Sequence, residues 1–166
     1  MKKILVSVAV LFFVIYAALE LASQKDSYPI SVDYERSVED GVKAGLYDYT
    51  NPNITSINFK TKRKGKADLV VELVRFNTRI STDYALRELD RMGYRPVELR
   101  ELLAFGEKYP DVQRKFPILA LGSVWQYGNG YRLIPCLYGN GSLRYLFLDW
   151  VGNGWDEIYR FAAVRK

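Results

Sequence analysis

The fold is decided near the C-terminus, where residues 118–165 read ILALGSVWQYGNGYRLIPCLYGNGSLRYLFLDWVGNGWDEIYRFAAVR. The triplet Gly-Asn-Gly occurs three times in this stretch, at 128–130, 139–141 and 152–154. Glycine and asparagine tolerate the positive φ angles that tight hairpin turns require, and apolar or aromatic residues flank each triplet. The spacing leaves room for one strand between successive turns. We therefore expect an antiparallel meander with strands near 118–126, 131–138, 143–151 and 157–165.

Two helices are predicted before this meander, after a strand at 67–76. The first helix opens at the Ser-Thr-Asp sequence of residues 81–83, whose side chains can accept the unpaired N–H groups of a first turn, and Gly93 ends it. The following corner is extended, because Pro96 disfavours helical angles at the residue before it. A second helix covers about residues 97–108. We expect the two helices to pack beside each other.

The preceding part of the chain, residues 24–66, is predicted to be an extension of strand and loop. A strand at 28–34 leads into a short helix that begins after Ser37 and stops at Gly45, and residues 47–59 form a loop. Five cations then follow within seven residues: Lys60, Lys62, Arg63, Lys64 and Lys66. A patch for nucleic acid or anionic lipid normally has interleaved aromatic residues and a larger field. We therefore interpret the cations as a solvated loop.

The first 23 residues have the layout of an export segment. Two lysines follow Met1, and an uninterrupted apolar run extends from Ile4 to Leu19, which would span roughly 24 Å as a helix. That length falls short of a bilayer core of about 30 Å and suits a secretory signal peptide. An uncleaved anchor that attaches the chain to a membrane through residues 4–22 is the alternative. Either case predicts an extracytoplasmic protein, secreted or anchored.

Histidine is absent from the 166 residues, and Cys136 is the only cysteine. The usual imidazole ligands and general bases are therefore missing, an internal disulfide is impossible, and we expect no metal or other cofactor. We expect the Cys136 thiol to be buried, with an intermolecular disulfide as the alternative. Removing Lys2, Lys3 and Glu20 with the leader lowers the formal charge from +5 to +4. That excess is too small to indicate a nucleic-acid partner.

Two motifs resemble a known family. The corner Gly93-x-Arg95-Pro96, with Glu101-Leu102 beyond it, is similar to the Gly-x-Arg-Leu-Pro-Thr-x-x-Glu-Trp helix corner of the formylglycine-generating-enzyme branch of the C-type lectin-like fold. The C-terminal residues 161–165, Phe-Ala-Ala-Val-Arg, are similar to that branch's terminal Phe-Arg-x-Val-Arg strand. This chain departs from the pattern at Glu98, where the family has Thr, and at Ala162, where the family has Arg, and it lacks the Leu before the proline.

The resemblance covers residues 67–166 and implies an α+β fold class, a C-type lectin-like domain with two helices and a C-terminal antiparallel β-meander. It also implies that loops and one face of the small sheet form a display surface. The variable proteins of diversity-generating retroelements belong to the same fold and are exported domains with last strands and turns that are rich in Tyr, Asn, Asp, Ser and Gly. The tail from Tyr127 to Arg160 resembles them in composition.

Aromatic residues are concentrated in the tail, where they account for ten of the 37 residues from Trp125 to Phe161. In the strand 143–151, alternation places Leu146, Leu148 and Trp150 on a core face and Tyr145 and Phe147 on the other. We predict that a ligand-binding surface includes Tyr127, Tyr131, Tyr138, Asn140, Tyr145, Phe147, Asp149, Asn153, Trp155, Asp156 and Tyr159. Such rings supply rigid contact area and can stack on sugars. The alternative is that the aromatic residues fill the core.

The composition also argues against an enzyme. Formylglycine generators use a cysteine pair, the related iron enzymes use histidines, and a Ser or Cys nucleophile would lack its histidine base here. Paired carboxylates can cleave glycosides, and Asp149, Asp156 and Glu157 are the candidates, although acids near hairpin ends are usually solvated turn residues.

We therefore expect an exported, non-enzymatic recognition module that binds an extracytoplasmic protein or glycan, and no nucleic acid, through its aromatic C-terminal hairpins. A carboxylate-dependent, glycosidase-like enzyme and a purely structural envelope protein are the alternatives. The exposure of the aromatic side chains of the tail distinguishes these hypotheses. A recognition module requires exposed rings, whereas a purely structural protein would have them buried.

Overall fold

The structure is a computed structural model that describes residues 27–128 and 130–166. The predicted leader, residues 1–23, lies outside the described residues, and so does Asn129. Within the described part, no helix has both the length and the apolar character needed to cross a bilayer.

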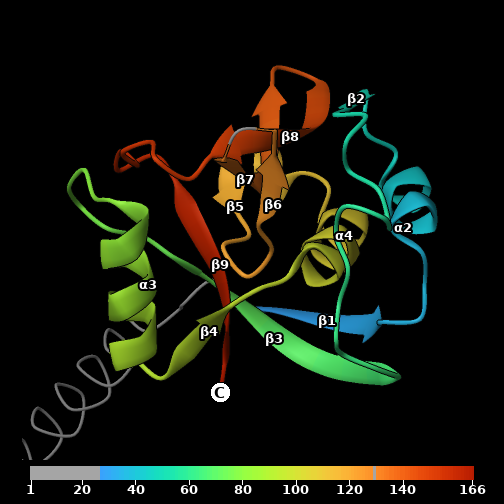
Figure 1. The fold of residues 1–166 in the computed structure, drawn as a ribbon, viewed down its shortest axis with the longest axis horizontal. Helices are drawn as coiled ribbons and strands as arrows, with labels where there is room; N and C mark the ends of the chain where they lie inside the picture. The colour runs from blue at the N-terminus through green and yellow to red at the C-terminus, as the bar shows by residue number, and fades with distance from the viewer. Residues whose placement is uncertain (1–26, 129) are drawn as a thin grey trace, which may run out of the picture.

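One mixed sheet of nine strands runs through the domain (Figure 1). Seven strands lie side by side in the order β1, β3, β9, β5, β7, β8 and β2, while β4 pairs with β9 and β6 pairs with β7. The pairs β5–β9 and β2–β8 are parallel, and the other neighbours are antiparallel. The strands are β1 (Ser27–Asp33), β2 (Tyr49–Thr50), β3 (Lys66–Val74), β4 (Tyr94–Pro96), β5 (Ile118–Leu119), β6 (Trp125–Tyr127), β7 (Tyr131–Asn140), β8 (Leu143–Trp150) and β9 (Arg160–Arg165).

Helices cover both faces of this sheet. α2 (Val38–Gly45) and α4 (Leu99–Lys108) pack against each other on one face, and α3 (Thr82–Arg91) lies on the other, to the left of β9 in Figure 1. Buried apolar residues accordingly form two clusters. The first core, on the side of α2 and α4, includes Val38, Leu102, Phe105, Ile118, Leu137 and Leu146. The second core, on the side of α3, includes Ala85, Leu89, Leu119, Cys136, Trp155 and Phe161. The expectation that the helices at 81–93 and 97–108 pack beside each other is therefore wrong.

The helices begin at caps that the sequence predicts. The Ser37 hydroxyl accepts a hydrogen bond from the Asp40 N–H at 3.0 Å, and the Ser81 hydroxyl accepts one from the Tyr84 N–H at 3.2 Å. α4 begins at Leu99, two residues later than expected. Glu98 is its N-cap and forms a capping box with Glu101.

The expected fold class, a C-type lectin-like α+β domain with two helices and a C-terminal meander, is wrong. β6, β7 and β8 do form consecutive antiparallel hairpins, with positive φ at Gly128, Gly130 and Gly141. After β8, however, the chain leaves this run of strands, and β9 enters the middle of the sheet between β3 and β5. The described residues form three α-helices and nine strands of mixed direction.

The side chains of β9 explain its central position. Phe161, Ala162, Ala163 and Val164 are all at most 1% exposed, and alternate residues belong to the second and the first core. A strand that is buried on both faces carries a continuous apolar run instead of an alternation. The third Gly-Asn-Gly triplet, 152–154, lies in the connection to β9, and neither of its glycines has a positive φ. It therefore ends β8 without making a hairpin.

A buried arginine joins the helices to the β7–β8 hairpin. The guanidinium of Arg144, a residue that is 5% exposed, donates to the carbonyl oxygens of Gly45 at 2.6 Å and Gly106 at 2.7 Å, near the ends of α2 and α4. It also donates to the amide oxygen of Gln113 at 3.0 Å and lies 4.9 Å from the centre of the Tyr47 ring. Helix ends leave carbonyl groups without intrahelical partners, so these contacts satisfy acceptors that burial would otherwise leave unpaired.

We predict that Arg144→Met lowers the free energy of unfolding by about 3–5 kcal/mol, because two buried carbonyl groups lose their charged donor. Arg144→Lys should be nearly as damaging, since an ammonium cannot reproduce the planar fork. Urea denaturation of both variants checks this, with the exposed Arg132→Met as the control that should change stability by no more than about 0.5 kcal/mol. A loss of less than 1 kcal/mol in Arg144→Met would contradict the role given to this residue.

Candidate functional site

Four aromatic rings gather on the outer surface of the β7–β8 hairpin, on the face opposite the first core. Tyr138 pairs with Tyr145 across the two strands, and Phe147 follows on the same face of β8. Tyr145 and Phe147 are stacked at 5.4 Å between ring centres, and the Tyr138 ring lies 6.0 Å from that of Tyr145. Tyr49, from β2, completes the group at 5.3 Å from Phe147. We call Tyr49, Tyr138, Tyr145 and Phe147 the outer aromatic cluster.

The outer aromatic cluster is accessible to solvent. Tyr49 is 44% exposed and Tyr138 is 38% exposed, while Tyr145 and Phe147 are half-buried against them. Leu143, on the same face of β8, is 42% exposed. An exposed group of large apolar side chains on one face is the kind of surface that binds partners. The structure therefore brings three predicted site residues together, and sequence reasoning missed the fourth, Tyr49.

Local sequence gives no signal for Tyr49. It lies in a segment that the sequence predicts to be a loop, and only the parallel pairing of β2 with β8 places it beside Tyr145. The residues on either side of β2 extend this pairing. The Asp48 N–H donates to the Arg144 carbonyl and the Asn51 N–H donates to the Leu146 carbonyl, each at 2.9 Å.

Three further predicted residues lie along the same face or beside it. Asn140 is exposed at the β7–β8 turn. Asp149 accepts hydrogen bonds from the Trp150 N–H at 2.9 Å and from the Asn153 side chain at 2.6 Å, so it organises the turn after β8. Tyr159 is half-buried against the Trp155 ring, and its pKa is raised by burial first and then by the charge of Asp149.

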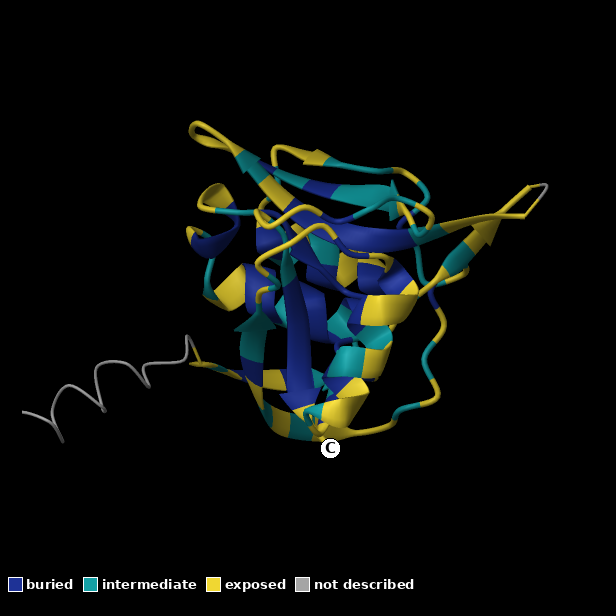
Figure 2. Cartoon of the chain, turned by 90° about the vertical axis from the view of Figure 1, so that its left-hand side faces the viewer, coloured by how far each residue is buried: buried dark blue, intermediate teal, exposed yellow. Residues whose placement is uncertain are grey.

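The other predicted aromatic residues lie on the opposite face, at the far end of the hairpin. Tyr127 pairs with Tyr131 across β6 and β7, and they are 57% and 61% exposed. The Tyr131 ring lies 6.2 Å from Trp150, and the Tyr127 ring lies 5.3 Å from Trp125. We call Trp125, Tyr127, Tyr131 and Trp150 the tip strip. Figure 2 shows the exposed ends of β6 and β7 projecting from the buried body of the domain. The expected single surface is therefore divided in two.

Trp155 and Trp150 occupy the reverse of their predicted environments. Trp155 was expected at the surface, but it is fully buried in the second core, where its indole N–H donates to the Thr82 hydroxyl at 2.8 Å and its backbone pairs with Ile80. Trp150 was expected in the core and is 46% exposed, while Leu148 is only half-buried. Leu146 is fully buried, as predicted.

The acidic candidates for catalysis, Asp149, Asp156 and Glu157, each contact different partners. Asp156 faces Arg79 at 3.6 Å and Glu157 faces Arg75 at 3.9 Å, and all four side chains are largely exposed. Asp149 is held in its turn. These carboxylates form ion pairs at the surface and hydrogen bonds within a turn, as solvated turn residues do.

Glu101 is a buried carboxylate and is fully paired. Arg95 donates to both of its oxygens, at 2.9 and 2.8 Å, and the Tyr34 hydroxyl donates at 2.5 Å. Burial alone would raise the pKa of Glu101, but the hydrogen bonds from Arg95, Tyr34 and the Glu98 N–H hold it below its usual value. Burial and the bond to Glu101 raise the pKa of Tyr34 to about 12. This cluster therefore fixes the corner at Arg95 to the start of α4.

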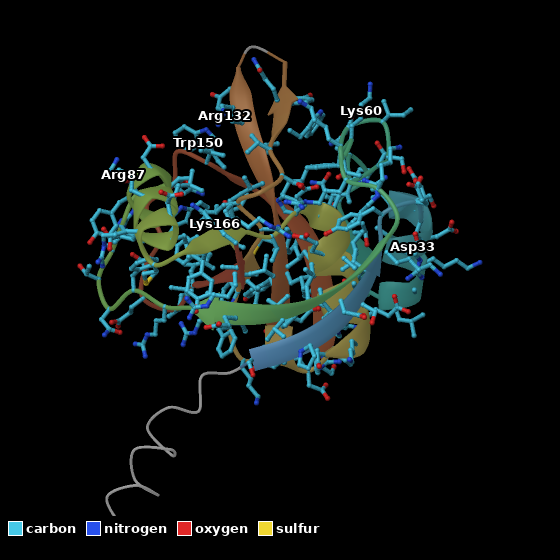
Figure 3. All side chains as sticks on the ribbon, turned by 90° about the horizontal axis from the view of Figure 1, so that it is seen from below. Asp33, Lys60, Arg87, Arg132, Trp150 and Lys166 are labelled. Carbon is cyan, nitrogen blue, oxygen red and sulfur yellow. The ribbon has the colours of Figure 1, made fainter. Side chains whose placement is uncertain are left out.

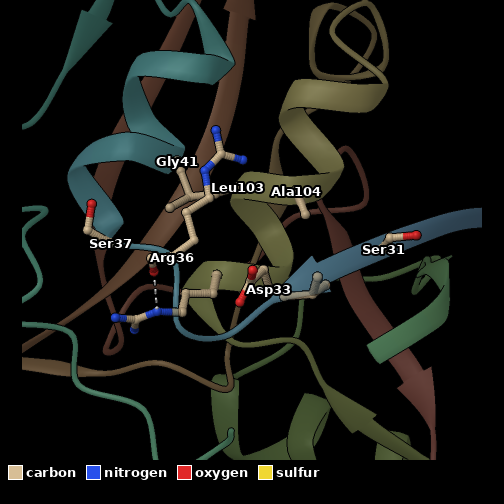
Figure 4. A pocket seen from close by; sticks show the side chains of 9 residues that line it. Ser31, Asp33, Arg36, Ser37, Gly41, Leu103 and Ala104 are labelled. Carbon is tan, nitrogen blue, oxygen red and sulfur yellow. Dashed lines mark hydrogen bonds between the residues drawn. The ribbon is translucent and has the colours of Figure 1, made fainter. Parts of the chain in front are cut away.

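A metal centre and an enclosed pocket are two further kinds of site that could support chemistry. Among the described residues, no group of three or more His, Cys, Asp or Glu side chains could hold a metal ion. A small pocket of about 90 Å³ lies between β1, α2 and α4 (Figure 4). Its wall includes Arg100, whose Nε donates to the Arg36 carbonyl at 3.1 Å. Typical ligand sites enclose about 300 Å³ or more, so this pocket suits only a few water molecules.

Comparison with known proteins adds no relative: no family model, no curated protein and no solved structure matches the chain. The resemblance of the Gly93–Pro96 corner to formylglycine-generating enzymes is not tested by this result and stays a prediction.

We predict that Leu146 and Tyr145, neighbouring residues of β8, contribute very differently to stability. Leu146→Ala should lower the free energy of unfolding by about 2–5 kcal/mol, because it leaves a cavity in the first core. Tyr145→Ser should cost about 1 kcal/mol, since its ring is half-exposed. Denaturant unfolding of the two variants measures the difference. Equal losses would show that the outer aromatic cluster is part of the core.

We also predict that the Cys136 thiol is inert in the folded protein. The residue is 4% exposed in the second core, and burial raises the pKa of the thiol far above its usual value. Because the thiolate is the reactive form, iodoacetamide should label Cys136 slowly at pH 8 in buffer and rapidly in urea. Equal labelling rates under the two conditions would refute this burial.

Proposed function

We propose that this chain is an exported, non-enzymatic recognition domain that binds an extracytoplasmic protein or glycan through the outer aromatic cluster. The observation that carries the proposal is the gathering of Tyr49, Tyr138, Tyr145 and Phe147, from three strands, on one solvent-exposed face. Aromatic side chains of this kind supply large contact area at a low cost in conformational entropy, and they dominate the binding energy of many interfaces.

The arrangement of the sheet supports display away from an N-terminal attachment. β1, the first described strand, lies at one edge of the seven-strand order, and β2, which carries Tyr49, lies at the other. Figure 1 likewise shows β1 below and β2 with β8 above. A leader or anchor that continues into β1 would therefore leave the outer aromatic cluster on the far side of the domain, accessible to a partner.

The two alternatives receive less support. The glycosidase-like alternative requires a pair of carboxylates across a cleft, and Asp156 and Glu157 instead face arginines at the surface. A purely structural role predicts that the tail rings are buried, and this holds for Trp155 but not for Tyr127, Tyr131 or Tyr138.

The proposal is tested by the retention of the purified domain, without residues 1–23, on envelope material from the cells that encode it. The double variant Tyr138→Ser/Tyr145→Ser should lose at least about tenfold in affinity, because it removes two of the four rings of the outer aromatic cluster. Val70→Ser on β3, where Val70 is 49% exposed, is the matched control and should bind like the wild type.

Treatment of the envelope material with protease or with periodate then separates a protein partner from a glycan. Equal retention of the wild type and the double variant, once circular dichroism shows that the variant is folded, would contradict binding through the outer aromatic cluster.

A further inference from the structure

The segment from Lys60 to Lys64 is a loop with exposed lysines ahead of β3, as predicted, and two of its other side chains anchor it to the domain. The Thr61 hydroxyl donates to one oxygen of Glu98 at 2.7 Å, and Arg63 Nε donates to the other at 2.8 Å. Because successive residues of extended chain point in opposite directions, anchoring residues 61 and 63 inward leaves the lysines at 60, 62 and 64 facing out. All three lysines are exposed, and none forms an ion pair with another described residue.

A polar groove separates these lysines from the connection that leads into β6. It has a volume of about 260 Å³, and its lining includes Lys60, Lys62 and Thr61 on one side and Ser123 on the other. Glu98 also lines the groove, but both of its oxygens already accept hydrogen bonds, from Thr61 and from Arg63. The lining therefore combines two lysines and hydroxyl groups with one carboxylate, Glu98, whose charge is paired with Arg63. A chain that carries negative charge and hydroxyl groups matches these partners.

The tip strip continues directly from this groove. The Phe59 ring lies 6.5 Å from Trp125, and Trp125 contacts Tyr127, which pairs with Tyr131. In Figure 3, Lys60 and Trp150 lie on opposite sides of the β6–β7 hairpin, so the strip crosses the hairpin from the cationic side. Aromatic residues were missing from the cationic segment in the sequence, and the fold supplies them from a strand more than 60 residues later.

We propose that the groove and the tip strip bind an acidic polysaccharide. The carboxylates of its sugars would pair with Lys60 and Lys62, and its rings would pack on Tyr127 and Tyr131, whose faces suit the apolar sides of pyranoses. A groove accommodates a single extended chain, whereas the flat surface of an anionic bilayer would not enter it. This site is separate from the outer aromatic cluster, which lies on the other face of the hairpin.

The test measures binding of the domain to polygalacturonate and hyaluronate at 150 mM salt, with methyl-esterified polygalacturonan as the neutral probe. The wild type should bind the acidic chains and not the neutral one. Lys60→Gln/Lys62→Gln should weaken binding about tenfold or more, since charged hydrogen bonds are lost. Tyr127→Ser should also weaken it. The control double variant Lys43→Gln/Arg87→Gln removes the same charge on α2 and α3 and should bind like the wild type.

Three outcomes would overturn the proposal. The first is absence of binding to both acidic chains, and the second is an equal loss in the control double variant, which would indicate non-specific attraction. The third is binding of vesicles with phosphatidylglycerol, or of oligothymidylate, that depends on Lys60 and Lys62 while the acidic chains do not bind. Tyr138→Ser/Tyr145→Ser should leave polygalacturonate binding unchanged, so failure here and failure of the function proposed for the outer aromatic cluster are distinguishable.

Discussion

The buried guanidinium of Arg144 is the interaction on which the arrangement of this domain depends. Its donors reach carbonyl groups near the C-terminal ends of α2 and α4 and the side chain of Gln113, so one residue of β8 fixes two helices and a turn to the sheet. Gln113 in turn donates to the carbonyl oxygens of Tyr138 and Tyr145 at 2.8 and 3.1 Å, the cross-strand pair of the outer aromatic cluster. The Tyr47 ring that covers Arg144 packs closely against Gly106. A Cβ at that position would lie 2.2 Å from the Tyr47 hydroxyl, so the packing requires glycine.

Because side chains alternate along a strand, the inward position of Arg144 places aromatic side chains of β8 on the outer face. With Arg144 and Leu146 directed into the first core, Tyr145 and Phe147 must occupy the other face of β8, and no helix covers them there. Further toward β9 the same face is covered by the second core, which buries Cys136. The hairpin thus changes from covered to exposed along its length, and its aromatic residues form two separate surfaces.

Local patterns in the sequence predicted the elements but not their arrangement. The caps at Ser37 and Ser81 and the hairpin turn at Gly141 follow from short-range chemistry, and they were predicted correctly. The position of β9 was not, because a Gly-Asn-Gly triplet permits a tight turn without requiring one. The four consecutive apolar residues from Phe161 to Val164 were the available signal for a central strand. Tyr49 joined the candidate site, and Trp155 left it, through long-range pairing that no local pattern encodes.

The aromatic residues of the tail divide between core and surface as the two faces of the hairpin require. Hydroxyl-radical footprinting of the free domain, read by mass spectrometry, tests this most directly because it compares two tryptophans in one experiment. Trp150 is 46% exposed and should be oxidised rapidly together with Tyr131, whereas Trp155 is fully buried and should be protected until the protein is denatured. Oxidation of Trp155 as fast as that of Trp150 in the folded protein would contradict this division between core and surface.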